Sequence, residues 1–206
     1  MTSILTTTHN GRRVSALRFL VAVVVITSVS LPGARLAATA DPAPSPEVSV
    51  REERGTYRVT ARFEVPQSPG VVLGVLSDYE RIPHFMPDVK TSIVLERAPG
   101  RLVVEQRAVS KFMMFSKEVH LVLEVIETGE SLKFTDRCQK SFKSYDGSWQ
   151  IEPRGSGSIV TYELSAEPAF DVPEFILKRL LKRDSGQLIN RLRVEFANRA
   201  QISSAN

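Results

Sequence analysis

The chain has 206 residues, 42% of them apolar, and carries 27 Lys and Arg against 23 Asp and Glu, a net charge of +4. This length fits one domain with a real core, and a single cysteine excludes an internal disulfide bond. The excess charge lies in residues 1–40, which hold four arginines and no acid, leaving 23 basic and 23 acidic residues in 41–206. A neutral domain argues against nucleic acid as a partner.

Residues 1–40 have the three-part layout of a secretory signal peptide. Three arginines precede an uncharged, mostly apolar run over 19–31, and Ala38 and Ala40 then form a small-x-small cleavage pattern. A membrane-spanning helix needs about 20 apolar residues, and this run is shorter. We therefore predict cleavage near Ala40 and a periplasmic or secreted protein, with an uncleaved anchor as the alternative.

The chain after the leader divides into a lead-in, one domain and a short tail. Residues 41–55 hold three prolines and several charged side chains, a composition that buries little apolar surface and predicts a flexible lead-in. Residues 56–200 have the length of a single domain, and 201–206 remain as a tail.

The domain opens with a strand followed by two short helices. Apolar and polar residues alternate from Tyr57 to Val65, which is the period of a strand with one buried face. Ser68 and Pro69 then mark a helix start, since serine is a common N-cap and proline fits the first turn. A second helical turn follows over 80–85.

From Val89 onward the chain returns to extended segments separated by glycine-containing turns. Short connections between strands favour antiparallel neighbours, so these segments predict a meander. The predicted strands lie near 89–97, 101–111, 115–127, 131–140, 143–153 and 157–167.

A long amphipathic helix ends the domain. Asp171 and Glu174 form a capping pattern, and an apolar stripe then steps by four or seven residues. The order of elements predicts an α+β fold, in which a curved antiparallel sheet of about seven strands wraps around the long C-terminal helix, with two short helices after the first strand. One helix cannot fill the concave side of such a sheet, and the space left is typical of small-ligand sites.

Three segments resemble those of a known superfamily. They are DYERIPHFMPDV at 78–89, SYDGSW at 144–149 and GSIVTY at 157–162. They are similar to segments of the START-like (SRPBCC, helix-grip) superfamily, and within it of the polyketide cyclase/dehydrase and coenzyme Q-binding group. The resemblance covers about residues 56–200 and implies a helix-grip fold. The superfamily includes lipid carriers, quinone binders and cyclases without one shared catalytic set, so it implies no catalytic residue here.

Residues at the expected helix–sheet space are the candidates for ligand contact. Methionine and aromatic side chains suit a variable apolar ligand, and a few polar groups would orient it. The alternatives are that the apolar ones are ordinary core residues, that Arg107 pairs with a glutamate across strands, and that His84 lies exposed on a turn. The predicted ligand-contacting set is Tyr79, His84, Phe85, Met86, Arg107, Met113, Met114, Phe115, Tyr145, Leu177, Leu181 and Leu188.

Four cations, Lys178, Arg179, Lys182 and Arg183, lie close together in the last helix. Such a run is usually a solvated helix face. The alternative is transient contact with anionic lipid head groups while a ligand is exchanged.

Other site chemistry finds little support in the sequence. His84 and His120 are the only histidines after the leader and lack metal-ligand spacing, and no G-x-S-x-G motif occurs. We expect no metal, no cofactor and no catalytic residue. The prediction is an exported, monomeric binding protein for a hydrophobic small molecule that is lipid-like or isoprenoid-quinone-like. The alternatives are a cyclase/dehydratase-type enzyme using polar groups in the same cavity, or a protein-interaction module of the cell envelope.

Overall fold

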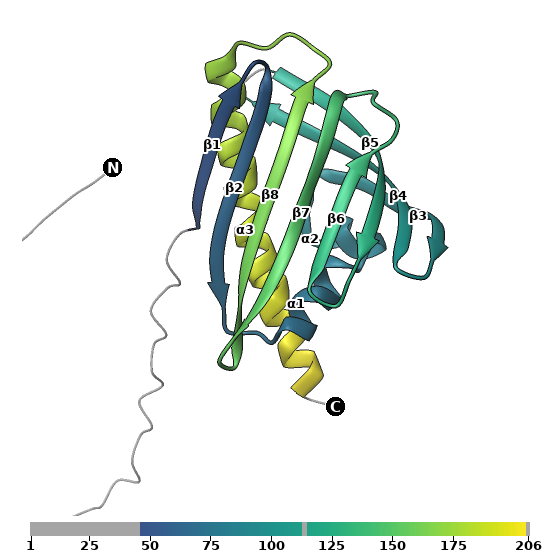
Figure 1. Ribbon diagram of the computed structural model, residues 1–206, viewed down its shortest axis with the longest axis vertical. Coiled ribbons are helices and arrows are strands. Elements are labelled where there is room, and N and C mark those ends of the chain that lie inside the picture. The colour runs from purple at the N-terminus through teal and green to yellow at the C-terminus, as the bar shows by residue number, and fades with distance from the viewer. Residues whose placement is uncertain (1–45, 113–114, 205–206) are drawn as a thin grey trace, which may run out of the picture. The chain divides into compact units, whose positions relative to one another are not determined.

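The computed structural model describes residues 46–112 and 115–204 (Figure 1). Within these residues eight strands form one sheet, in which every hydrogen-bonded neighbour is antiparallel. The strands are β1 (Glu47–Glu53), β2 (Thr56–Val65), β3 (Val89–Ala98), β4 (Arg101–Phe112), β5 (Phe115–Glu127), β6 (Ser131–Asp136), β7 (Phe142–Arg154) and β8 (Gly157–Pro168). The helices are α1 (Pro69–Leu76), the 3-10 helix η1 (Tyr79–Arg81), α2 (Ile82–Phe85) and α3 (Glu174–Ser204).

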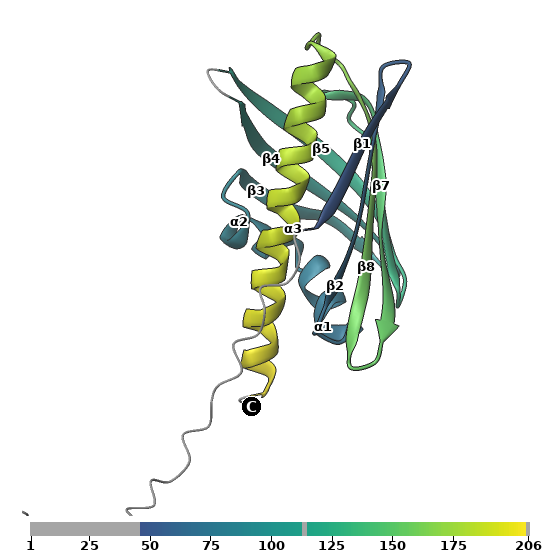
Figure 2. The same ribbon diagram turned by 90° about the vertical axis from the view of Figure 1, so that its left-hand side faces the viewer.

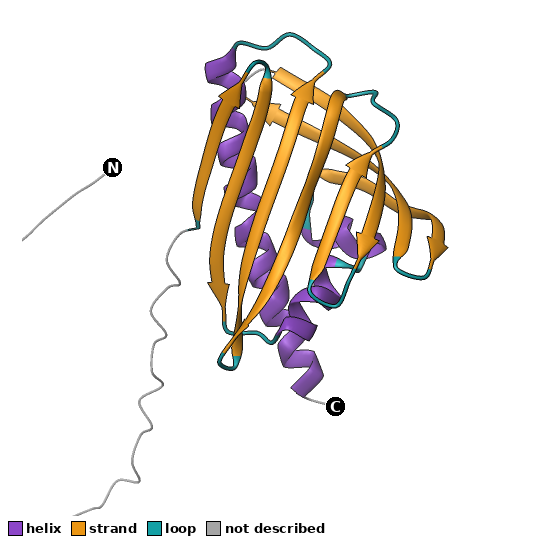
Figure 3. Ribbon diagram, viewed as in Figure 1, coloured by secondary structure: helices purple, strands orange, loops and turns teal. Residues whose placement is uncertain are grey.

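The sheet order is β1-β2-β8-β7-β6-β5-β4-β3. Strands β3 to β8 follow one another as a meander, and β2 then pairs with β8, which joins the two ends of the domain sequence. The sheet curves around α3, which runs along its concave side, while α1 and α2 lie near one end (Figures 2 and 3). This confirms the α+β architecture predicted from the sequence, with eight strands where about seven were expected.

Strand β1 corrects the prediction of a flexible lead-in. Residues 47–53 pair with β2 along their whole length, and Val48 is buried in the core. The hairpin turns through Arg54 and Gly55, both with positive φ (53° and 83°), a conformation that glycine adopts without strain. The prolines of residues 41–55 all precede this strand. The average composition of residues 41–55 therefore hid the short alternation of apolar and polar residues within the strand.

The ends of the chain differ from the prediction in extent. The predicted signal peptide over 1–40 and its cleavage site lie outside the described residues. Helix α3 continues to Ser204 and therefore includes most of the segment predicted as a tail. Although α3 has 31 residues, no helix in the described part of the chain is apolar enough over a sufficient length to cross a membrane.

The core lies between α3 and the concave face of the sheet. Alternate residues of β2 point inward, and the register places Phe63 opposite Val160 of β8. Ile189 and Phe196 of α3 are fully buried in this core, so the C-terminal half of the helix packs closely against it. A second cluster forms around Val104 and its neighbours on β4 and β5.

Strand β3 forms one edge of the sheet, and β1 forms the other. Its pairing with β4 shifts register twice, between Val89 and Thr91 and again between Val94 and Glu96. Each shift bends and twists the strand locally, because an extra residue is left without a partner in the ladder.

Candidate functional site

Nine apolar or aromatic side chains on the inner side of the fold are only half-buried, although they pack against the buried core. We call them the concave surface. They come from α2, four different strands and the first half of α3, and they are Ile82, Phe85, Val94, Val119, Phe134, Phe142, Tyr145, Leu181 and Leu188. Four of them (Ile82, Phe134, Phe142 and Tyr145) contact both core clusters. Interior apolar side chains that keep accessible surface mark a space that the protein does not fill itself.

The aromatic part of the concave surface is built around Tyr145 of β7. Its ring centroid lies 4.9 Å from that of Phe142 and 5.9 Å from that of Phe134 on β6. Gly147 faces Phe134 directly across the β6–β7 ladder. A Cβ at Gly147 would lie 2.6 Å from Cζ of Phe134, so the missing side chain provides the room in which this ring lies.

Tyr145 is the polar group of this aromatic cluster. Burial raises the pKa of Tyr145 to about 12, while a hydrogen bond with Tyr162 partly offsets this effect. Burial also raises the pKa of Tyr162, whose ring stacks on Trp149 with centroids 4.3 Å apart. Both phenols therefore stay neutral over the physiological pH range, and Tyr145 acts as a hydrogen-bonding group inside an apolar space.

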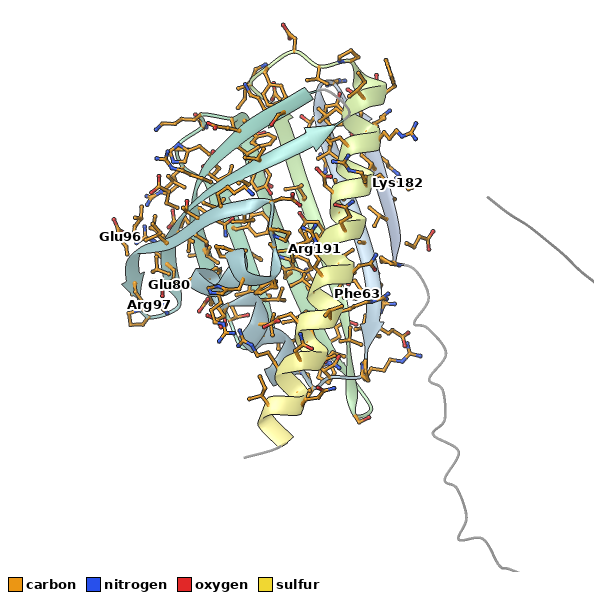
Figure 4. The ribbon with its side chains drawn as sticks, turned by 180° about the vertical axis from the view of Figure 1, so that it is seen from behind. Phe63, Glu80, Glu96, Arg97, Lys182 and Arg191 are labelled. Carbon is orange, nitrogen blue, oxygen red and sulfur yellow. The ribbon has the colours of Figure 1, made fainter. Side chains whose placement is uncertain are left out.

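The segment from Asp78 to Asp88 contributes Ile82 and Phe85 to the concave surface and is tied to α3 at both its ends. Arg199 Nη2 donates to Asp78 Oδ2 at 2.7 Å, and Arg191 Nη1 donates to Asp88 Oδ2 at 2.8 Å. Figure 4 shows Arg191 about midway along α3. These two ion pairs position Ile82 and Phe85, which lie between them in sequence, over the concave surface.

Tyr79 holds the same segment to the sheet. It is buried, and its hydroxyl donates to Glu127 Oε1 of β5 at 2.6 Å. Burial, and then this hydrogen bond, raise the pKa of Tyr79 well above its ordinary value. The phenol of Tyr79 thus makes a structural hydrogen bond.

Asp136 of β6 is a buried carboxylate on the same strand as Phe134, and both of its oxygens already accept hydrogen bonds. They accept the backbone N–H groups of Val122, Cys138 and Gln139 at 2.9, 3.2 and 2.9 Å. The carboxylate therefore fixes the turn after β6.

The structure brings together some of the predicted ligand-contacting residues. Phe85, Tyr145, Leu181 and Leu188 belong to the concave surface, whereas Tyr79, Met86 and Leu177 are buried in the core next to it. Met113 and Met114 lie outside the described residues, and Phe115 begins β5 with its side chain undescribed.

Two predicted residues lie elsewhere. His84 is exposed on α2. Arg107 points to the convex face, opposite to Val104 and Gln106; its side chain is 61% exposed, and its Nη2 lies 3.2 Å from Glu105 Oε1. Placing Arg107 in the ligand site was wrong, because β4 has apolar residues on both faces and the sequence does not show which face is concave.

Sequence reasoning missed the two phenylalanines of the aromatic cluster. Phe134 alternates with Leu132 and Asp136 on β6, so its inward direction was readable from the period. Phe142 lies before a register shift at the start of β7, where the period of two breaks down. The inward direction of Phe142 follows only from its pairing with Pro168 of β8 in the structure.

The cationic run of α3 is only partly free for a surface role. Lys178 pairs with Glu174, and Arg183 pairs with Asp184 at 2.7 Å. Arg179 is exposed, as is Lys182, which Figure 4 labels on α3. Phe175 beside them is 74% exposed.

A separate open groove of about 620 Å³ lies between the start of β1, the end of β2 and the β7–β8 turn. Phe63 is labelled in Figure 4. Arg193 of α3 lies over its ring, 5.2 Å from the centroid. Arg154 at its rim pairs with Glu64. The groove is open to solvent and lined by charged side chains such as Glu47, Arg62 and Arg154, whereas the concave surface is lined by apolar and aromatic side chains. The concave surface is therefore the better candidate for an apolar ligand.

Several solved structures have a fold similar to that of this chain. The STAR-related lipid transfer protein of Xanthomonas axonopodis aligns over 77% of this chain and 97% of its own, with TM-score 0.63 and 18% identity. The Zhui aromatase/cyclase of Streptomyces sp. R1128 aligns over 70% and 96%, with TM-score 0.62 and 12% identity. Human STARD10 aligns over 79% and 77%, with TM-score 0.58 and 9% identity.

At these identities the structural likeness shows the fold, which is the START-like helix-grip fold that the sequence segments predicted. No protein of curated function matches the chain in sequence. The family model described as polyketide cyclase / dehydrase and lipid transport matches residues 65–193, more than half of the chain. The chain therefore belongs to the polyketide cyclase/dehydrase and lipid transport family.

Proposed function

We propose that this protein is an exported binding protein that holds a hydrophobic small molecule, lipid-like or isoprenoid-quinone-like, between its sheet and α3. The observation that carries the proposal is the concave surface: nine inward-facing side chains that remain half-buried around one phenol. The family description, which includes lipid transport, agrees with a ligand of this class.

The apolar lining supplies enough free energy for useful affinity. Each CH₂ group moved from water into such a space contributes about 0.8 kcal/mol, so a ten-carbon segment gains roughly 8 kcal/mol before the costs of binding. Those costs are about 4 kcal/mol or more, so an apolar chain of about 15 carbons, which gains roughly 12 kcal/mol, is needed for a dissociation constant of about micromolar. Affinity of that order allows a carrier to release its ligand.

The polar groups of the site favour binding over turnover. Burial raises the pKa of Tyr145 to about 12, which makes its phenol a weak proton donor, and Asp136 is occupied by backbone amides. The alternative, a cyclase/dehydratase-type enzyme, would need Tyr145 as an acid, and would lose turnover while keeping its ligand when this residue becomes phenylalanine.

Co-purification tests the main proposal. We would express the chain with its leader, isolate the protein without detergent, extract it and analyse the extract by mass spectrometry. We expect a co-purifying lipid or quinone in wild type. A protein that is recovered empty, and that also fails to bind added quinones and phospholipids, would refute the carrier function.

Export and membrane contact form part of the same proposal. We propose that the leader is cleaved near Ala40, that the monomer acts in the periplasm or outside the cell, and that Arg179, Lys182 and Phe175 touch anionic lipid during exchange. Binding to phosphatidylglycerol vesicles should fall with salt. It should also fall in the double variant Arg179→Glu, Lys182→Glu, with Lys133→Glu of β6 as the control. Equal binding by both variants would remove the helix face from the proposal.

A further inference from the structure

We propose that Tyr145 donates a hydrogen bond to an uncharged acceptor oxygen of the ligand, such as a ketone, quinone, ester or hydroxyl oxygen. This inference rests on the proposed function and narrows its ligand class. The ligand would combine an apolar body with one neutral oxygen, and an anionic head group would not reach Tyr145.

The position of Tyr145 is the first step. The register of β7 with β8 pairs it with Ala166, whose row of the sheet faces α3, so the phenol points into the concave side. Tyr145 packs against both core clusters and yet is only half-buried. A residue that is deep in the fold and still accessible lines an internal space.

The hydrogen-bonding capacity of its hydroxyl is the second step. Tyr162 is the hydrogen-bonding neighbour of Tyr145, and its ring stacks on Trp149 with centroids 4.3 Å apart. A phenol can donate one hydrogen bond and accept others, so a single neighbour leaves Tyr145 capacity for a second partner. Among the residues that the structure describes, no second partner for its hydroxyl is found, so a ligand oxygen is the fitting partner.

The surroundings of Tyr145 select against a charged group. Phe134 and Phe142 flank the phenol at 5.9 and 4.9 Å, and the buried Asp136 already adds negative charge nearby. A ligand carboxylate placed there would lose its hydration without gaining a cation. An uncharged oxygen avoids both costs.

A cation on the concave side lies farther out. Lys117 of β5 is opposite Ser110, whose hydroxyl reaches Asp184 of α3, so this row faces the helix. Its Nζ lies 4.9 Å above the ring of Phe170, which in turn lies 6.4 Å from Phe142. Two aromatic rings thus separate Lys117 from Tyr145, and a charged head group would pair with the lysine.

Three probes with the same carbon count test the proposal: valerophenone (a ketone), pentylbenzene (no oxygen) and phenylvalerate (a carboxylate). Each would displace the neutral fluorescent probe N-phenyl-1-naphthylamine from wild type, Tyr145→Phe and Tyr79→Phe. We expect wild type to prefer valerophenone to pentylbenzene by about five- to tenfold, the effect of one buried hydrogen bond. Phenylvalerate should bind more weakly than both.

Tyr145→Phe should lose the preference for the ketone and keep its affinity for pentylbenzene, whereas Tyr79→Phe, which loses a structural contact only, should keep the preference. Equal binding of ketone and hydrocarbon by wild type, or an equal loss of both in Tyr145→Phe, would overturn the inference and leave the carrier function standing. Failure of wild type to bind pentylbenzene and the fluorescent probe would instead overturn the proposed function, and this inference with it.

Discussion

Gly147→Ala is the substitution whose effect follows most directly from the structure. An added Cβ would lie 2.3 Å from the backbone oxygen of Glu163 and 2.6 Å from Cζ of Phe134. The first contact is with the neighbouring strand, which cannot move without distorting the β7–β8 ladder. The second can be relieved only by driving the Phe134 ring toward the concave surface.

The expected cost of this overpacking is about 1–3 kcal/mol in the free energy of unfolding. Gly186→Ala is a matched control of opposite sign. Gly186 lies inside α3, and an added Cβ meets no atom within 4 Å. Because alanine is the better helix former, the control should be more stable than wild type by about 0.5–1 kcal/mol.

Urea unfolding followed by circular dichroism would measure both changes, with unchanged slopes for a two-state comparison. Displacement of N-phenyl-1-naphthylamine would show whether Phe134 has moved into the ligand space: Gly147→Ala should bind the probe more weakly and Gly186→Ala should not. Gly147→Ala with wild-type stability would refute the steric argument, and equal losses in both variants would point to a general intolerance of change.

Three further predictions concern the ligand space, the tyrosines and the segment tied to α3. Leu181→Trp and Leu188→Trp should fill the concave surface and reduce probe binding at least tenfold, whereas Val194→Trp, on an exposed position of α3, should not; three equal affinities would place the ligand elsewhere. All four tyrosines have pKa values in the folded state that are raised above 10, the pKa of tyrosine in the unfolded chain. The stability that their neutral phenols contribute is therefore complete below pH 10 and is lost as the pH rises through the higher pKa values of the folded state. Absorbance at 295 nm should therefore show no tyrosinate with a midpoint near pH 10 until the domain unfolds, and a normal titration of any tyrosine would contradict this. Arg199→Met should destabilise by about 1–2 kcal/mol in urea, because Asp78 loses its partly buried partner; an unchanged midpoint would show that this ion pair does not hold the segment.

The sequence predicted the order of the elements well, because turn residues and changes of period are local signals. Pro69 begins α1 as expected, and the hairpin turns separate strands whose bounds agree to within a few residues. Strand β1 escaped prediction because Val48 and Val50 are too few to outweigh the charges and prolines around them.

The site was harder to predict than the fold. Alternation shows which residues share a face but does not show which face is concave. Both faces of β4 carry buried residues, Val103 on the convex face and Val104 on the concave face. The sequence therefore offered no reason to assign Arg107 to one face rather than the other. The half-buried state of Phe134 and Phe142 depends on the curvature of the whole sheet, which no single segment encodes.

The two register shifts of β3 have a consequence for how this protein behaves at high concentration. An edge strand with free N–H and C=O groups can template another chain, and β3 also exposes Ile93 and Leu95, which would stabilise such a pairing. The shifts break its flat ladder, and Glu96 and Arg97 add charge at the same edge (Figure 4). The irregular edge therefore acts as a guard against strand-to-strand aggregation, and regularising it would make the protein self-associate.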